Sequence, residues 1–448
     1  METAALLKKY NVAAPRYTSY PTVPYWDNEN FDTNKWEGAV QAIYASHLDE
    51  GISLYIHLPF CESLCTYCGC NTRITKNHAV ELPYIMAVLV EWKMYLKLLG
   101  AQPKIKELHL GGGTPTFFQP ENLQVLIKGI LDQAVLTPES SFSFEAHPAN
   151  TTFAHLETLY QLGFKRLSLG IQDFDPKVQL MINRFQTPQQ VATVTEQARA
   201  IGFNSINFDL IYGLPCQTIN GLSSTIEEVI QMRPDRIAFY SYAHVPWIKP
   251  GQRHYTEEDL PVGDAKFALY QTGKQHLQDA GYHDVGMDHF ALNTDSLFIA
   301  SKEQQLHRNF MGYTDQHTHL LIGLGVSSIS DGWNAFAQNP KTVEAYLERV
   351  GKGILPVEKG HLLSEEDLVI RRHILNMMCK ETTKYGDGIP DRVYERLFPL
   401  IEDGLVQITG NEISVTPNGK SFLRNICMAF DEKLWAKQPE TKIFSAAI

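Results

Sequence analysis

Apolar segments of strand length recur at regular intervals through the middle of the chain: 52–58, 105–110, 141–146, 166–172, 205–213 and 236–243. Amphipathic stretches of helical length, such as 81–100 and 188–202, separate them. The joint from helix to strand also repeats. Gly163, Gly202 and Gly281 each stand where a helix ends in a residue of left-handed conformation, and an aromatic residue follows each of them. Six strand–helix units predict an α/β fold, a parallel sheet covered by helices that forms a partial (β/α)6 TIM-like barrel.

The pattern changes beyond residue 360. Ser364 and Asp367 form a capping box that opens an amphipathic helix, and a second helix covers 390–404. Two short alternating strands follow around Gly410, and then a further helical segment, which together predict a mostly helical, winged-helix-like domain. We therefore expect three parts: an irregular N-terminal extension over the barrel mouth (1–50), the barrel with its trailing segment (51–355), and the C-terminal domain (356–448).

Charge and composition limit the possible partners. The chain has 448 residues and a formal net charge of −11, which argues against nucleic-acid binding. No apolar run approaches the ~20 residues of a membrane helix, and the N-terminus does not resemble a secretion signal. We expect a cytoplasmic protein that binds neither nucleic acid nor membrane, and a monomer, because nothing in the sequence demands an obligate partner.

Four of the seven cysteines lie within ten residues, in the stretch "YIHLPFCESLCTYCGC". A structural zinc site normally uses two pairs separated by a longer loop, so this spacing is atypical of zinc. Cys61, Cys65 and Cys68 are spaced to reach three corners of a cubane cluster, whereas Cys70 follows too closely for the fourth. Such a cluster keeps one iron open to a ligand. The remaining cysteines are single in their segments and are typical of small buried hydrophobes: Cys216, Cys379 and Cys427.

Polar residues stand at the carboxyl ends of successive predicted strands. They are Glu145, Gln172, Asp209 and the glycine-rich turn 111–116. Since the working residues of such barrels gather at this end, we expect one site there, beside the cysteines that follow the first strand.

The C-x3-C-x2-C spacing after the first barrel strand resembles the signature of the radical S-adenosylmethionine enzymes. The resemblance implies a [4Fe–4S] cluster held by Cys61, Cys65 and Cys68, with S-adenosylmethionine on the open iron. Further segments extend the likeness over nearly the whole chain, among them "APRYTSYPT", "CGCNTRIT", "INFDLIYGLPCQT", "LHRNFMGYT" and "RNICMAFD". These are similar to the oxygen-independent coproporphyrinogen III oxidases.

That resemblance implies an oxidoreductase of haem biosynthesis. The reaction is oxidative decarboxylation of two propionates of coproporphyrinogen III to vinyls, giving protoporphyrinogen IX through a 5′-deoxyadenosyl radical. An electron donor must reduce the cluster, and the sequence does not identify it. The resemblance also implies which residues bind S-adenosylmethionine. The molecule on the cluster is bound by Tyr55, Tyr67, Gly112 and Glu145. A second molecule is bound by Gly113, Thr114, Gln172, Arg184, Asp209, Ala243 and Ile329.

Among these residues we expect Tyr55, Glu145 and Arg184 to be catalytic. A substrate with four carboxylates calls for local positive charge. Three arginines in the matching motifs are the candidates: Arg16, Arg308 and Arg424.

Three other readings remain open. The first is a related radical enzyme that opens or methylates the haem ring. Residues 146–149 and Met311 leave this interpretation open, because they depart from the family pattern. The second is a haem chaperone without turnover, against which the "CGC" triplet and "PRYTSYPT" argue. The third is a structural metal site.

Overall fold

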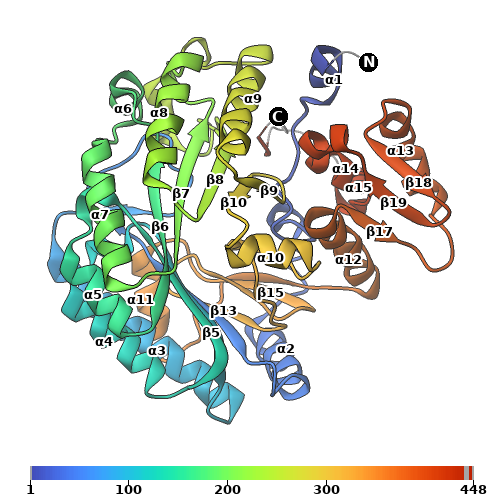
Figure 1. The fold of residues 1–448 in the computed structure, drawn as a ribbon. Helices are drawn as coiled ribbons and strands as arrows, with labels where there is room; N and C mark the ends of the chain where they lie inside the picture. The colour runs from blue at the N-terminus through green and yellow to red at the C-terminus, as the bar shows by residue number, and fades with distance from the viewer. Residues whose placement is uncertain (1–2, 438–442, 446–448) are drawn as a thin grey trace.

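The parallel barrel predicted from the strand–helix repeat is present. In this computed structural model, which describes residues 3–437 and 443–445, six strands pair in parallel and in chain order (Figure 1). They are β1 (Ile52–Leu58), β4 (Lys104–Gly112), β5 (Val135–Ala146), β6 (Phe164–Gln172), β7 (Ser205–Tyr212) and β8 (Arg236–Ser241). Every predicted strand therefore exists, and the fold is a partial TIM-like barrel.

Helices pack in sequence order around the outside of this sheet (Figure 1). They are α3 (Glu81–Leu99), α4 (Pro120–Leu131), α5 (Phe153–Gln161), α7 (Pro188–Ile201), α8 (Ile219–Met232) and α9 (Asp264–Asp279). Their buried side chains and those of the strands form one continuous apolar core, which includes Trp92, Phe144 and Phe208. The core fixes the strands, and the strand ends in turn position the site.

The sheet is wider than the repeat predicted. β13 (Leu321–Leu324) pairs in parallel with β1. Antiparallel strands continue that edge: β14 (Ile329–Asp331), β15 (Ala335–Gln338) and β16 (Lys359–Leu362). Beyond β8 lie β10 (His289–Ala291) and β9 (His283–Val285), also antiparallel. The sheet thus ends in two separate edges, at β16 and at β9, and the barrel stays open.

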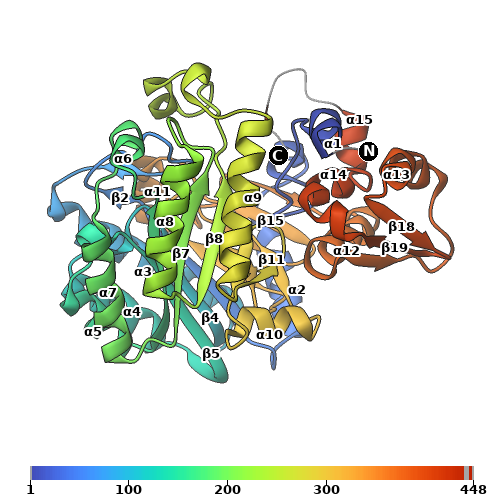
Figure 2. The ribbon, with the colours of Figure 1, turned by 45° about the horizontal axis from the view of Figure 1, so that its top comes forward.

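The C-terminal helices and hairpin also form as expected, beside the barrel (Figure 2). Helix α12 (Glu365–Lys380) begins at the predicted capping box, in which the hydroxyl of Ser364 accepts from the Asp367 N–H and the Asp367 carboxylate accepts in return. The other elements are β17 (Thr382–Lys384), α13 (Asp391–Glu402), β18 (Val406–Thr409), β19 (Glu412–Val415), α14 (Leu423–Met428) and α15 (Glu432–Ala436). A second apolar core joins them to segments near residues 6–20 and 285–313.

The N-terminal fifty residues are more regular than expected, since they contain α1 (Thr3–Tyr10) and α2 (Thr33–Ser46). Asp32 caps α2 by accepting from the Lys35 N–H, and Trp36, Val40 and Tyr44 repeat every fourth position on its buried face. This stripe packs α2 against α3 and β15. Across the described residues, no helix is long and apolar enough to cross a membrane.

Candidate active site

The cysteine-rich loop lies at the carboxyl end of β1 and is closed by a short parallel pair, β2 (Phe60–Cys61) and β3 (Arg73–Ile74). Main-chain bonds fix its base, including Thr75 N–H to the Cys61 carbonyl at 2.9 Å. The glycine turn after β4 packs directly beneath it. A Cβ at Gly113 would lie 2.7 Å from the Pro59 carbonyl oxygen, so only glycine allows this approach.

Thiols of the loop face one cavity of about 260 Å³, whose lining includes Cys61, Cys65, Cys68 and Cys70. Cys61 Sγ lies 3.4 Å from the Thr114 hydroxyl. Burial raises the pKa of the Cys61 thiol to about 11, whereas a hydrogen bond from Cys70 lowers the pKa of Cys68. Cys70 therefore sits beside the three predicted ligands and contacts one of them.

Glu145, on β5, supplies the negative charge at the centre of the mouth. Its carboxylate accepts a hydrogen bond from the Gly112 N–H at 3.1 Å and lies 3.5 Å from Nε2 of His109. Loss of solvent opposes ionisation, but His109 and the Gly112 N–H outweigh it, and the pKa of Glu145 is lowered. With 43% of its side chain exposed, this carboxylate can also reach a ligand in the cavity.

Arg184 stands opposite, immediately after α6 (Pro176–Ile182). Its guanidinium donates to the Gly170 carbonyl and, at 3.6 Å, to Cys65 Sγ. The residue is only 8% exposed, and its Nε has no partner among the described residues. The same holds for Oε1 of Gln172, which is 7% exposed and ends β6 in a left-handed conformation (φ 69°). Two buried polar atoms without partners in one cavity fit a polar ligand.

Asp209 on β7 faces the same cavity. It accepts from the Ser168 hydroxyl at 3.1 Å and from the Asn207 amide at 2.8 Å. Burial and the nearby charge of Glu145 raise the pKa of Asp209 to about 6. The two carboxylates of the mouth therefore differ, one held ionised and the other close to neutral at moderately acidic pH.

Tyr55 and Ile329 line an adjoining cavity of about 420 Å³, which shares Glu145, Gly112 and Cys70 with the first. The Tyr55 hydroxyl lies 2.9 Å from Nδ1 of His57. Burial raises the pKa of this tyrosine, which keeps it protonated at neutral pH. Tyr55 is thus placed as a neutral hydrogen-bonding group.

Two further predicted residues meet through a third. The Gln252 amide donates to the carbonyls of both Tyr67 (3.0 Å) and Ala243 (3.2 Å). Tyr67 lines the first cavity, whereas Ala243 lies outside the linings of both cavities. Gln252 therefore joins the cysteine loop to the end of β8.

The three candidate substrate arginines gather away from the thiols, around residues 14–16. Arg16 donates to the Ser241 carbonyl at 3.0 Å, and Arg308 donates to the Arg16 carbonyl at 3.3 Å. Arg424 donates to the carbonyls of Pro15, at 3.1 Å, and Ala14. Arg16 and Arg424 line a small cavity with Lys266, and Arg308 lies over the Tyr313 ring. All three arginines are thus engaged with the fold itself.

Two site residues were missed from the sequence, His109 and His147. His109 is the partner of Glu145, and alternation along β4 places it on the same face as Gly111, a signal that was available. His147 lines the first cavity, and burial beside Arg184 lowers its pKa to about 3. Its position follows from the turn after β5, which no local pattern specifies.

The comparisons with known proteins agree with this geometry. The sequence model described as the Radical SAM superfamily matches residues 55–229, which span the cysteine loop and the barrel through α8. This class uses a [4Fe–4S] cluster and S-adenosylmethionine. The three thiols around one cavity, together with the unpartnered Arg184 and Gln172 atoms, fit both groups.

Whole-chain relatives narrow the class. The chain is 37% identical to the oxygen-independent coproporphyrinogen III oxidase of Synechocystis sp., over 100% of this chain and 98% of the relative. It is also 37% identical to the enzyme of that name from Pseudomonas aeruginosa, over 96% of each chain. The solved structure of coproporphyrinogen III oxidase from Escherichia coli, a radical SAM enzyme, matches with a TM-score of 0.89 and 36% identity, over 96% of this chain and 98% of that one. The chain belongs to the oxygen-independent coproporphyrinogen III oxidase family.

Proposed function

We propose that this protein converts coproporphyrinogen III to protoporphyrinogen IX without oxygen, by oxidative decarboxylation of two propionates to vinyls. The observation that carries the proposal is the mouth of the barrel. There three thiols, two carboxylates and a buried arginine with an unpartnered Nε surround one cavity. Together with family membership over the whole chain, this supports the family's reaction.

Cys61, Cys65 and Cys68 would hold the cluster, and Tyr55, Tyr67, Gly112 and Glu145 would hold the S-adenosylmethionine bound to it. When bound, these groups supply a 5′-deoxyadenosyl radical that takes a hydrogen atom from a propionate side chain. The ionised Glu145 suits a cationic amino or sulfonium group, because its carboxylate stays charged at neutral pH. Tyr55, kept protonated, can donate a hydrogen bond without carrying charge.

A second S-adenosylmethionine belongs to the proposal, at Gly113, Thr114, Gln172, Arg184, Asp209, Ala243 and Ile329. What supports it is the pair of unpartnered atoms, Arg184 Nε and Gln172 Oε1. The guanidinium suits a carboxylate, and the amide oxygen suits an amino or hydroxyl donor. Ala243 contributes least to this support, because its carbonyl is already bound by Gln252 and it lies outside both cavities.

For the substrate we propose Arg16, Arg308 and Arg424 as the positive lining. The support for Arg16 and Arg424 is the cationic cavity that they line, and Arg308 joins them through its hydrogen bond to the Arg16 carbonyl. The bonds of Arg308 and Arg424 to main-chain carbonyls would also hold the N-terminal segment in place. We also propose the division at residues 50 and 355, a monomeric state, a cytoplasmic location and an external electron donor.

The test is anaerobic turnover. Reconstituted protein with reductant, S-adenosylmethionine and coproporphyrinogen III should release carbon dioxide and form protoporphyrinogen IX together with 5′-deoxyadenosine. Cleavage of S-adenosylmethionine without carbon dioxide release would overturn the substrate and favour a ring-modifying enzyme. Binding of haem without any cleavage would favour a chaperone. Cys61→Ala should abolish turnover. Its matched control is Cys216→Ala, which changes a thiol far from the cysteine loop in sequence and should keep full turnover.

A further inference from the structure

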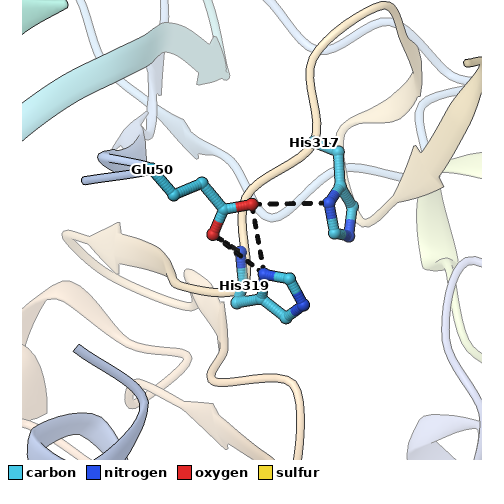
Figure 3. A group of neighbouring side chains, drawn as sticks. All are labelled: Glu50, His317 and His319. Atoms are coloured by element: carbon cyan, nitrogen blue, oxygen red, sulfur yellow. Dashed lines mark hydrogen bonds and ion pairs between the residues drawn. The ribbon is translucent and has the colours of Figure 1, made fainter. Parts of the chain in front are cut away.

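A second group of ligand-type side chains lies at the opposite end of the sheet from the thiols. Glu50 precedes β1, and His317 and His319 precede β13. Because β1 and β13 pair in parallel, the segments that enter them meet at the amino-terminal edge (Figure 3). The Ser53 hydroxyl lies 2.8 Å from the Thr318 hydroxyl, which ties these two segments together.

The three side chains converge on one point. Nδ1 of His319 lies 2.8 Å from Oε2 of Glu50, and Nδ1 of His317 lies 3.6 Å from Oε1. One ligand atom from each residue lies within 4.8 Å of the others. Ligands at ~2.0–2.1 Å from a tetrahedral metal stand roughly 3.3 Å apart, so small side-chain rotations bring these atoms into a coordination sphere.

The surroundings hold this arrangement in place. The His319 N–H donates to Glu50 Oε2 at 3.0 Å, which fixes the carboxylate. The His47 ring stacks on His319 at 3.9 Å, and Trp333 packs edge-on against both ligand imidazoles. A structural ion pair with Glu50 needs one imidazole, whereas here a second imidazole also points its Nδ1 at the same carboxylate.

The group is open to solvent as well as ordered. The side chains of His317, His319 and Glu50 are 35%, 27% and 21% exposed. His317 also borders a cavity of about 450 Å³. A metal held here by three protein atoms would therefore have room for a water as its fourth ligand.

We propose that Glu50, His317 and His319 bind one divalent transition-metal ion of the zinc type, through one carboxylate oxygen and two imidazole nitrogens. Nitrogen and oxygen donors of this kind suit zinc and its neighbours rather than magnesium or calcium. The ion would join the entrances of β1 and β13, which are about 270 residues apart in sequence. The proposal does not depend on the reaction at the other end of the barrel.

Zinc is the probe, and the cluster-loaded protein is the sample, so that the cysteines are occupied. Anaerobic equilibrium dialysis followed by elemental analysis should find one zinc per chain beyond the cluster. His317→Ala, His319→Ala and Glu50→Gln should each weaken zinc binding by more than the ~10- to 100-fold that loss of an outer-shell partner costs. His47→Ala, which removes a stacked ring and no ligand, is the matched control and should keep the zinc.

Equal cluster absorbance in all variants checks that each one folds. If His319→Ala fails that check, His317→Ala remains decisive, because its imidazole makes only the longer 3.6 Å approach to Glu50. Zinc should also raise the melting temperature of the wild type and not of His317→Ala. No bound zinc in the wild type, or equal zinc in the wild type and His317→Ala, would overturn the proposal.

Discussion

At the scale of single residues, the mouth of the barrel separates two carboxylates by their partners. Glu145 has a histidine and a main-chain N–H, and its pKa falls. Asp209 has only neutral hydrogen-bond donors, so burial and the charge of Glu145 prevail and raise its pKa to about 6. The buried Arg184 is a positive group in the same cavity and contacts Cys65. A positive group of a ligand can therefore pair with Glu145, and a negative group can pair with Arg184.

Loss of one predicted cluster ligand should remove the cluster. In Cys61→Ala the remaining thiols supply too few ligands, so the iron content and the visible absorbance of the cluster should fall to background. Cys70→Ala should keep the iron content and the cluster absorbance. Cys70 lies outside the C-x3-C-x2-C ligand motif, and it contacts the predicted ligand Cys68 by a hydrogen bond. Full cluster absorbance in Cys61→Ala would contradict the ligand assignment.

Glu145→Gln should weaken binding of S-adenosylmethionine. Hydrogen bonds to charged groups contribute about 1.5–3 kcal/mol, which corresponds to roughly a 10- to 100-fold rise in the dissociation constant. Calorimetric titration of the cluster-loaded protein with S-adenosylmethionine measures this dissociation constant. Glu139→Gln, an exposed change on the same strand, should leave the affinity unaltered. Equal affinities for Glu145→Gln and wild type would remove Glu145 from the binding site.

At the scale of elements, the strands that could be predicted are those in strand–helix units and the hairpin β18–β19 around Gly410. β13, β14, β15 and β16 have three to four residues each. The first three follow one another without an intervening helix, and β16 returns antiparallel to β15 after a single short helix, so these strands lack the parallel strand–helix repeat. The cysteine ligands could be proposed because they are local in sequence. Alternation along β4 places His109 on the face of the mouth, but its contact with Glu145 depends on which strands become neighbours. The contact of Arg184 with Cys65 depends on the course of two loops, which the spacing of residues does not specify.

Glu91 on α3 ties this unpredicted edge to the barrel. Its buried carboxylate accepts hydrogen bonds from the Gly325 N–H at 2.8 Å, the Asn339 amide at 2.7 Å and the Tyr346 hydroxyl at 2.7 Å. These partners lie on the β13–β14 turn, after β15 and on α11 (Val343–Gly351). Burial nevertheless prevails and raises the pKa of Glu91 to about 7. A single carboxylate thus couples the stability of this edge to pH.

Because the folded pKa of Glu91 lies above its ordinary value of 4.5, the folded state holds a proton that the unfolded state has lost. Stability should therefore fall as pH rises from 4.5 to about 7, by about 3 kcal/mol at 1.36 kcal/mol per pKa unit. In Glu91→Gln this dependence should vanish. Melting temperatures at pH 5 and 8 should show the wild type losing stability relative to the variant, and an unchanged difference would contradict the assignment.

At the scale of the whole molecule, two apolar cores are joined by buried charge. Arg371 on α12 forms a bidentate pair with Asp331 on β14, at 3.1 and 2.6 Å, and its guanidinium lies 4.3 Å from the centre of the Trp333 ring. Both residues are less than 10% exposed. This pair fixes α12 against β14 at the residue that pairs with Leu321, so the contact lies at the end of the sheet where β13 begins, opposite the barrel mouth.

Arg371→Gln should be among the most damaging changes outside the mouth. It leaves the Asp331 carboxylate buried without its cation, and breaking such a pair costs about 3–5 kcal/mol. Arg392→Gln removes the ion pairs of the exposed Arg392 with Glu366 and Glu432. It should cost no more than about 1 kcal/mol, because Glu366 is exposed to solvent and Glu432 keeps Arg396 as a partner. Thermal unfolding of both variants gives the comparison. Because the unpaired charge causes most of the loss, the double change Arg371→Leu with Asp331→Leu should recover much of the stability. If the double variant is no more stable than Arg371→Gln, the cost arises from lost packing on Trp333 and Phe336 and not from the stranded charge.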